Sequence, residues 1–292
     1  MAPTVLRPPQ PFDLRLSLRA AGIGSFDATG AAWYVTTTTH GAATARLESA
    51  GEDVRAELWG SGADALLAAL PRVLGFDDTA ASPPKGGGLI ADLARRSRGL
   101  RLGSTGNVHE VIVPTILGQL VTTREARAGH RRMMRALGDR APGEHPGLFV
   151  PPTPDRLASL GYEDLHTYGI ERKRAQVVIE ASRRASRLEE IIAMEPEVAR
   201  RRLLAVRGVG PWTAETVMGV AYGDRNAVPP GDHNLPHMVA WALAGEDRAS
   251  DDRMFELLEP YRPERRRAVV LIKQSGIHAP RYGPKTPVRR HL

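Results

Sequence analysis

Two glycines followed by a proline interrupt a helical pattern between residues 196 and 223, and this interruption constrains the fold more than any other feature. The apolar run at Leu204 and Val206 would end one helix, and Pro211 would begin the next. Gly208 and Gly210 can adopt positive φ and therefore suit a tight turn. Proline suits the first position of a helix, where its missing N–H has no partner to lose. The segment therefore predicts a helix, a short hairpin and a second helix.

The hairpin also suits the binding of an anion. Amides at the start of a helix carry partial positive charge, and glycines leave room for a phosphate to approach them. We therefore expect the backbone at Gly208, Gly210 and Thr213 to hold a DNA phosphate. A turn between two helices that binds no ligand is the alternative. Carbonyl oxygens near the turn would also suit a monovalent cation, Na⁺ or K⁺, held by Leu204, Val206 and Val209.

A single carboxylate follows the hairpin. Asp232 comes directly after Pro-Pro-Gly, 20 positions beyond Trp212, and this position predicts the N-cap of a further helix. Capping alone is one interpretation. The other is chemical, because helix amides would keep the carboxylate ionised. A fixed anion beside C1′ of a sugar stabilises the positive charge that develops as a base leaves, and it could orient or deprotonate the attacking water.

Composition bounds the possible classes of protein. A length of 292 residues with 42% hydrophobic and 25% charged residues is ordinary for a globular protein. No apolar run approaches the roughly 18 residues of a membrane span, so we expect a cytoplasmic protein. The absence of cysteine excludes disulfides, thiolate metal sites and cysteine-ligated iron–sulfur clusters. The histidines form no HExxH spacing, and no catalytic metal is expected.

The chain divides into an α+β part and a mostly helical part. Residues 1–80 contain β-rich runs separated by glycines and then a helical pattern, which predicts a small antiparallel sheet with helices. Residues 81–106 are expected to form a linker, punctuated at 82–88, and a connecting helix. Residues 107–292 predict an all-helical body that ends in a basic, irregular tail. Asn107 and Glu110 have the spacing of a capping box at its start.

Basic residues gather in two places. Residues 253–292 hold ten Lys and Arg against three Asp and Glu, which equals the whole net charge of +7. Glutamates are mixed into the second cluster, so a solvated helix face and a phosphate-binding surface both remain open. That cluster consists of Arg172, Lys173, Arg174, Arg183, Arg184, Arg187, Arg200, Arg201, Arg202 and Arg207.

The hairpin, Trp212 and Asp232 together resemble the helix-hairpin-helix-GPD superfamily of DNA glycosylases, and within it the bacterial DNA-3-methyladenine glycosylase II branch. Further segments carry the resemblance across nearly the whole chain, in the same order: residues 11–13, 116–121, 149–154 and 169–175. The resemblance implies a mostly α fold with an amino-terminal α+β domain. It also implies a monomer that acts on double-stranded DNA containing a damaged base, without a cofactor for catalysis.

The resemblance assigns roles to individual residues. Asp232 would be the catalytic residue, and Leu120 would fill the gap left by a flipped-out nucleotide, although a core leucine is the alternative. Gln119 would contact the opposite DNA strand or support the protein turn in which it lies. Trp212 stands where glycosylase/lyases of this superfamily carry a nucleophilic lysine. Because tryptophan forms no Schiff base, the expected reaction is monofunctional hydrolysis that leaves an abasic site.

The predicted base pocket departs from the alkylpurine enzymes. It comprises Trp212, Thr216, His233 and Lys273, and aromatic residues are expected where Thr216, Lys273 and Gln274 stand. An aromatic pocket selects cationic N-alkylated purines, whereas a lysine would repel them. A shifted alignment, a phosphate contact by Lys273 and a neutral lesion remain open. Three functions therefore compete: excision of an alkylated base, excision of a neutral lesion such as hypoxanthine or an oxidised purine, and non-catalytic binding of damaged or abasic DNA.

Overall fold

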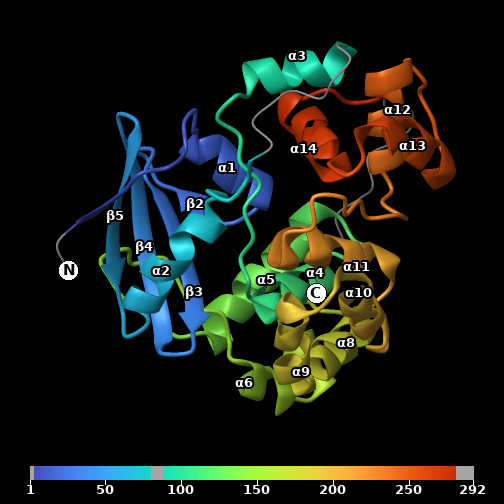
Figure 1. Cartoon of the computed structure of the whole chain (residues 1–292). Helices are drawn as coiled ribbons and strands as arrows, with labels where there is room; N and C mark the ends of the chain where they lie inside the picture. Colours follow the sequence, from blue (N-terminus) through green and yellow to red (C-terminus); the bar gives the residue numbers. More distant parts are fainter. Residues whose placement is uncertain (1–2, 80–87, 281–292) are drawn as a thin grey trace.

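A five-stranded antiparallel sheet forms the amino-terminal layer of the computed structural model, which describes residues 3–79 and 88–280 (Figure 1). The strand order is β1-β5-β4-β3-β2. The strands are β1 Thr4–Leu6, β2 Ser25–Phe26, β3 Ala32–Thr38, β4 Gly41–Ala50 and β5 Asp53–Trp59.

One face of the sheet is buried because its apolar residues alternate along the strands. On β4, for example, Ala43, Ala45 and Leu47 are fully buried. Helices α1 (Leu14–Ala21) and α2 (Ala63–Val73) contribute leucines to the same core. The structure therefore contains the antiparallel sheet with helices that the first eighty residues predict.

A second core lies inside the helical body and contains the predicted hairpin. Its helices surround the almost entirely apolar α4, eight of whose ten residues are buried. They are α4 Val108–Leu117, α5 Thr123–Leu137, α6 Pro154–Ala158, α7 Tyr162–His166, α8 Arg172–Arg183, α9 Ala185–Glu189, α10 Pro196–Leu204 and α11 Pro211–Val217. Short 3-10 and π segments, Glu190–Ala193 and Met218–Tyr222, extend α9 and α11.

A third core differs from the expected organisation. Helix α3 (Gly88–Arg96) is not a simple connector, because it packs against α14 (Arg265–Ser275) and shares a core with α12 (Leu235–Ala244) and α13 (Asp251–Leu258). In Figure 1 these four helices form a separate group above the helical body. Residues 107–280 thus contribute to two cores, and the chain passes from one to the other between α11 and α12.

Buried polar groups join the layers. Asn107 caps α4 by accepting from the Glu110 amide at 3.1 Å, as the capping spacing predicts. The Glu110 carboxylate does not close the box but accepts from Thr36 Oγ1 (2.8 Å) and the Thr37 amide (2.7 Å) of β3. Arg267 of α14 pairs with the buried Asp78 carboxylate at 2.5 Å. These contacts attach the sheet to both helical cores.

Two predicted segments lie outside the described residues, namely most of the linker at 82–88 and the end of the basic tail, residues 281–292. Within the described part, no helix is both long and apolar enough to cross a membrane.

Candidate functional site

The predicted hairpin joins α10 to α11. Its Val209 amide donates to the Val206 carbonyl at 2.9 Å, which closes the turn. Gly208 adopts φ +90°, and a Cβ placed there would lie 2.2 Å from Cγ2 of Val177 on α8. Glycine is therefore required at 208 both by its conformation and by the approach of a neighbouring helix.

The φ angle of Gly210 is negative, whereas a positive φ was considered for it. It is the N-cap of α11, with φ −96° and ψ 179°, a conformation open to any residue. A Cβ added to Gly210 would meet no atom within 4 Å. The backbone at the start of α11 therefore faces open space, which is what a bound phosphate would need. Thr213 is buried as a whole residue, so the phosphate contact expected there stays a prediction.

A fully exposed leucine stands next to the hairpin. Leu120 follows α4 and is the only described non-glycine residue with positive φ, at +56°. This left-handed conformation costs a leucine roughly 1–2 kcal/mol. The structure thus contradicts the alternative that Leu120 is a core residue. An apolar side chain held in solvent by a strained backbone is suited to insertion between bases.

Gln119 fixes the leucine relative to the hairpin. Its Nε2 donates to the Gly208 carbonyl at 3.1 Å and to Thr213 Oγ1 at 2.9 Å. On the other side, the buried Arg174 of α8 donates to the Leu117 carbonyl at the end of α4 (2.9 Å). Gln119 therefore supports the turn, and Leu120 is carried on a loop anchored to α8 and to the hairpin.

Asp232 lies just ahead of α12 and its carboxylate is bound on both oxygens. Oδ1 accepts from the amides of Asn234 and Leu235, each at 2.9 Å. Oδ2 accepts from Nε1 of Trp212 on α11 at 3.2 Å. Asp232 therefore caps α12 and at the same time contacts the helix that follows the hairpin. The carboxylate is half-buried, so it remains accessible.

The surroundings of Asp232 keep it ionised. Burial alone would raise its pKa, but the amides of Asn234 and Leu235, the Trp212 indole and the charge of Lys273 together outweigh burial and lower the pKa. Hydrogen bonds that donate to a carboxylate favour its charged form in this way. The group is consequently an anion at neutral pH.

Trp212 connects the carboxylate to the loop that carries Leu120. A Cβ added to Gly118 would lie 3.5 Å from Cη2 of the indole ring, so the ring borders this loop. Thr216, one turn further along α11, is half-buried and donates from Oγ1 to the Trp212 carbonyl at 2.8 Å. His233 is exposed beside Asp232. Asp232, Trp212 and the Leu120 loop are thus adjacent, and sequence reasoning missed the Trp212–Asp232 hydrogen bond that joins them.

Lys273 reaches the same region from α14. It is exposed to solvent, yet its charge interacts with that of Asp232. Burial among protein atoms lowers its pKa, Asp232 opposes this, and Arg266 adds to it. The next residue, Gln274, donates from Nε2 to the Leu16 carbonyl of α1 at 3.0 Å. The charge of Lys273 thus acts on Asp232, and Gln274 joins α14 to residues 14–20.

The cation site predicted at the hairpin can be described only in part. Leu204 is 45% exposed, whereas Val206 and Val209 are buried, and the Val206 carbonyl already accepts the Val209 amide. The cation at these carbonyls stays a prediction. In residues 3–79 and 88–280, no cluster of His, Asp and Glu side chains has the arrangement of a metal site.

The second basic cluster of the sequence divides into paired and free arginines. Arg184 pairs with Glu180 at 2.5 Å, and Arg200 and Arg202 pair with carboxylates of neighbouring helices. Within the described part of the chain, no hydrogen bond or ion pair is found for the guanidinium groups of Arg187 and Arg201. The solvated-face interpretation therefore applies to several members of the cluster but not to all of them.

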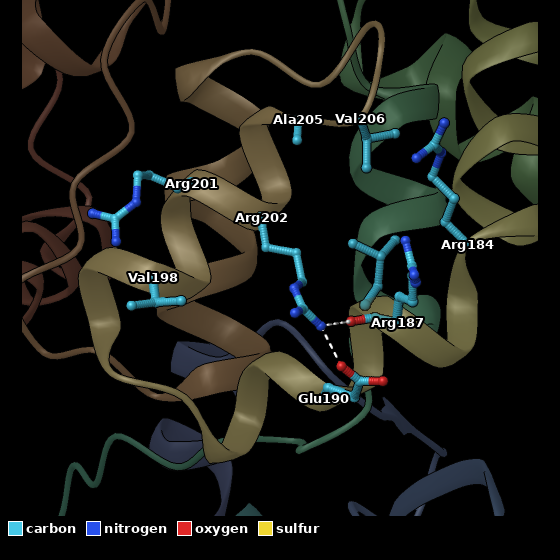
Figure 2. Close-up of a pocket in the computed structure, with 9 residues that line it drawn as sticks. Arg184, Arg187, Glu190, Val198, Arg201, Arg202, Ala205 and Val206 are labelled. Atoms are coloured by element: carbon cyan, nitrogen blue, oxygen red, sulfur yellow. Dashed lines mark hydrogen bonds and ion pairs between the residues drawn. The ribbon is translucent and has the colours of Figure 1, made fainter.

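Arg187 and Arg201 lie at a pocket between α9 and α10, beside the hairpin. Figure 2 shows Arg202 crossing this pocket toward Glu190, with Arg187 and Arg201 on opposite sides. The pocket has a volume of about 560 Å³ and also includes Ala205 and Val206 at the start of the hairpin. It contains none of the residues around Asp232. It is therefore a candidate for contact with the DNA backbone and not for the chemistry.

Comparison with known proteins agrees with this geometry. No family model matches the sequence. The chain is 28% identical over 187 residues to DNA-3-methyladenine glycosylase 2 of Escherichia coli, which covers 63% of this chain and 64% of the relative. Its fold is similar to that of the 3-methyladenine DNA glycosylase from Archaeoglobus fulgidus, with a TM-score of 0.79, 20% identity, and coverage of 92% of this chain and 96% of the other.

The chain thus resembles DNA-3-methyladenine glycosylases in sequence and helix-hairpin-helix DNA glycosylases in fold. A second solved structure of similar fold is the 8-oxoguanine glycosylase/lyase of Clostridium acetobutylicum, with a TM-score of 0.76, 15% identity, and coverage of 93% of this chain and 95% of the other. The chain spans only about 55 to 64% of the length of the first curated relatives it matches. The resemblance to these glycosylases, predicted from the hairpin, Trp212 and Asp232, is confirmed.

Proposed function

We propose that the protein is a monofunctional DNA glycosylase of base excision repair, which flips a damaged purine out of double-stranded DNA and hydrolyses its N-glycosidic bond. The observation that carries this proposal is the carboxylate of Asp232, held ionised by two helix amides and the Trp212 indole beside the hairpin. These three donors hold the half-buried carboxylate in place without a cation as partner. Its negative charge can therefore act on a substrate.

The proposed reaction begins with the DNA backbone and the flipped base. The open amides at the start of α11 would hold a phosphate, and the exposed Leu120 would replace the everted nucleotide in the stack. The deoxyribose C1′ would then lie near Asp232. As the base departs, positive charge grows on the sugar, and the carboxylate stabilises it electrostatically. The same carboxylate would orient the attacking water.

The absence of a lysine at 212 supports hydrolysis without strand cleavage. An indole cannot form a Schiff base, so water is the expected nucleophile and an intact abasic strand the product. We propose that the protein acts as a monomer. The names of the relatives favour an N-alkylated purine as the substrate. A neutral lesion is a second candidate, favoured by the position of Lys273 near Asp232.

The experiment that tests the proposal is base release by the Asp232→Asn variant. Asparagine keeps the two amide contacts through its Oδ1, but it has no charge and its Nδ2 cannot accept from Trp212. We expect a small loss of thermal stability and a fall in single-turnover release of at least about a hundredfold, the scale of one lost electrostatic stabiliser. Release that persists at the wild-type rate would remove Asp232 from the mechanism.

Non-catalytic binding makes a different prediction. A protein that only binds damaged or abasic DNA would show tight binding to an abasic duplex but no release of any base by the wild type. The accessibility of the Asp232 carboxylate favours the enzyme.

A further inference from the structure

Helix α5 carries a third group of basic residues, which the proposed hydrolysis does not use. The helix begins three residues after Leu120 and contains five arginines and a single acidic residue, Glu125. Four of the arginines are exposed and follow one another at spacings of three, four and four residues. At about 100° per residue, these spacings place all four within an arc of about 80° on one face of the helix. This α5 stripe consists of Arg124, Arg127, Arg131 and Arg135.

The opposite face of α5 is fixed against the protein. Gly129 and Met133 are buried on that face, and a Cβ added to Gly129 would lie 3.4 Å from the carbonyl oxygen of Tyr168. The fifth arginine, Arg132, is held by the same segment, because it donates to the Tyr168 carbonyl from Nε at 2.9 Å and from Nη2 at 2.7 Å. The helix therefore cannot turn its arginines inward, and the α5 stripe faces solvent.

The α5 stripe has no partner of opposite charge in the protein. Across residues 3–79 and 88–280, no hydrogen bond or ion pair is found for its four guanidinium groups. Glu125 lies in the first turn, half-buried, with its Oε1 enclosed. Like charges three or four residues apart weaken a helix, and a cation near its start opposes the helix dipole. An external anion would relieve both effects.

The Leu120 loop lies between the hairpin and α5. Helix α4 packs against both α5 and α11, and Figure 1 shows these two helices on either side of α4. Gln119 attaches the loop to the hairpin through its 3.1 Å bond to the Gly208 carbonyl, whereas the chain leaves the loop directly into α5. With Leu120 inserted at a lesion, the hairpin and the α5 stripe would thus meet DNA on different sides of the leucine.

The dimensions of the α5 stripe suit the backbone of a duplex. Its ends are 11 residues apart, which corresponds to about 16 Å along the helix axis at 1.5 Å per residue. One DNA strand presents a phosphate about every 3.4 Å along the duplex axis, so several phosphates fall within that length. The guanidinium group of arginine also matches phosphate oxygens with two parallel hydrogen bonds.

We propose that the α5 stripe binds the phosphate backbone of the duplex arm on the side of Leu120 away from the hairpin. This inference rests on the proposed function and adds to it a second, separate contact with DNA. An apolar side chain inserted between base steps kinks the duplex, which costs free energy that additional contacts offset. The hairpin and the α5 stripe would each hold one arm of the kinked duplex.

The test measures the affinity for abasic duplexes with two long arms, or with either arm shortened to the few base pairs beside the lesion. Shortening either arm should weaken binding by wild type at least about tenfold, because phosphate contacts dominate affinity. In Arg127→Gln/Arg131→Gln, one of the two shortenings should lose most of its effect. Gly210→Ala, which obstructs the hairpin, should instead lose the effect of shortening the other arm.

The salt dependence of binding is a second readout. Removal of two phosphate contacts should lower the slope of log affinity against log salt concentration by up to about 2 for the duplex with two long arms. With the stripe-side arm shortened, Arg127→Gln/Arg131→Gln and wild type should have the same slope. This comparison assigns the lost contacts to one arm of the DNA.

Arg132→Gln is the matched control, because it removes the same charge from the same helix at the residue held by Tyr168. It should keep the sensitivity of wild type to both arms. Thermal melting shows whether the arginines serve the fold. Glutamine has nearly the helix propensity of arginine, and the substitution relieves repulsion between like charges. Arg127→Gln/Arg131→Gln should therefore melt no lower than wild type.

Four results would overturn the inference. Sensitivity to both arms that equals wild type in Arg127→Gln/Arg131→Gln would leave the α5 stripe to an acidic protein partner. An equal loss in Arg132→Gln would show an effect of net charge alone. Loss of the same arm in Gly210→Ala would place both contacts on one side of Leu120, and a lower melting temperature of the double variant would assign the arginines to the fold.

Failure of the proposed function looks different. Base release by wild type is measured on a damaged duplex with two long arms, whereas the α5 stripe is tested by binding alone. Release of a base together with any of those four results would overturn only this inference. A wild type that releases no base, but whose two arms respond separately to the stripe and hairpin variants, would overturn only the enzymatic activity.

Discussion

The indole Nε1 of Trp212 donates to Oδ2 of Asp232 over 3.2 Å, and this contact joins the hairpin to the carboxylate. The hydrogen bond contributes to the low pKa of Asp232. Its removal by Trp212→Phe should therefore raise that pKa. Because the reaction needs the ionised carboxylate, the acid limb of the rate profile should move to higher pH.

The measurement is single-turnover base release by Trp212→Phe and wild type from about pH 3 to about pH 8, so that the range includes the acid limb. Trp59→Phe is the matched control, because Trp59 lies on β5 and stacks on Trp33, in the amino-terminal layer. We expect the acid limb to move only in the Trp212 variant. An acid limb that coincides with that of wild type would show that the indole does not tune the carboxylate.

The two hairpin glycines should respond in opposite ways to substitution by alanine. Gly208→Ala forces a residue with a Cβ into positive φ and against Val177, so it should lower the free energy of unfolding by more than about 2 kcal/mol. Gly210→Ala meets no atom in the protein, and its effect on stability should stay below about 1 kcal/mol. Its methyl group would instead obstruct a phosphate.

Chemical denaturation and DNA affinity measured on both variants check this prediction. We expect Gly210→Ala to fold normally and to bind an abasic duplex at least about tenfold more weakly, since the added methyl group would keep the phosphate away from the helix amides. Normal affinity in a folded Gly210→Ala protein would mean that the start of α11 does not contact the DNA.

The buried carboxyl of Glu110 should make stability depend on pH. Burial raises its pKa from 4.5 to about 7, against the hydrogen bonds from Thr36 and Thr37, and the charge of Glu189 adds to the increase. The folded protein therefore holds a proton that the unfolded chain releases above pH 4.5. Stability from this group is present below that pH and is lost as the pH rises to about 7, by about 3 kcal/mol at most.

Glu110→Gln carries no titrating proton and should remove this dependence. The measurement is the free energy of unfolding from urea denaturation at a series of pH values between about 4.5 and 8. We expect its decline with pH to be shallower in Glu110→Gln than in wild type. Glu163→Gln, which changes an exposed carboxylate of α7, serves as the control and should follow wild type.

Local patterns in the sequence predicted much of the fold. The hairpin between α10 and α11 and the capping of α4 by Asn107 were both predicted, because each depends on residues within one short segment. Asp232 was predicted to be the N-cap of a helix, but α12 begins later, at Leu235, and Asp232 caps it by accepting from the amides of Asn234 and Leu235. Such a shift depends on side-chain geometry and leaves no periodic signal.

The parts of the site that were predicted each lie within one short segment of the sequence. The hairpin, Leu120 and Asp232 each belong to a recognisable local motif, but the hydrogen bonds that join these motifs were not predicted. Gln119 reaches Gly208, and Trp212 reaches Asp232, only after distant helices pack. The charge of Lys273 likewise acts on Asp232 only after α12 and α14 pack together in the third core. Interactions of this range have no signature in a single sequence.

The arginine-lined pocket beside the hairpin predicts an additional contact with the DNA backbone. Arg187 and Arg201 lie at its two sides (Figure 2), and their guanidinium groups are free of partners within the described residues. A contact that neutralises a phosphate releases counterions, and each one adds about 0.9 to the slope of log affinity against log salt concentration. The double variant Arg187→Gln/Arg201→Gln should therefore bind more weakly and lower this slope by up to about 2.

The measurement is the affinity for an abasic duplex at several salt concentrations. Arg7→Gln/Arg55→Gln removes the same charge from the sheet layer, which lies away from α9 and α10 in Figure 1, and should leave the slope unchanged. If both double variants lower the slope equally, net charge and not the pocket is responsible. A slope reduced only in the pocket variant, with base release rates at saturating enzyme unaffected, would place the pocket on the path of the DNA and outside the chemistry.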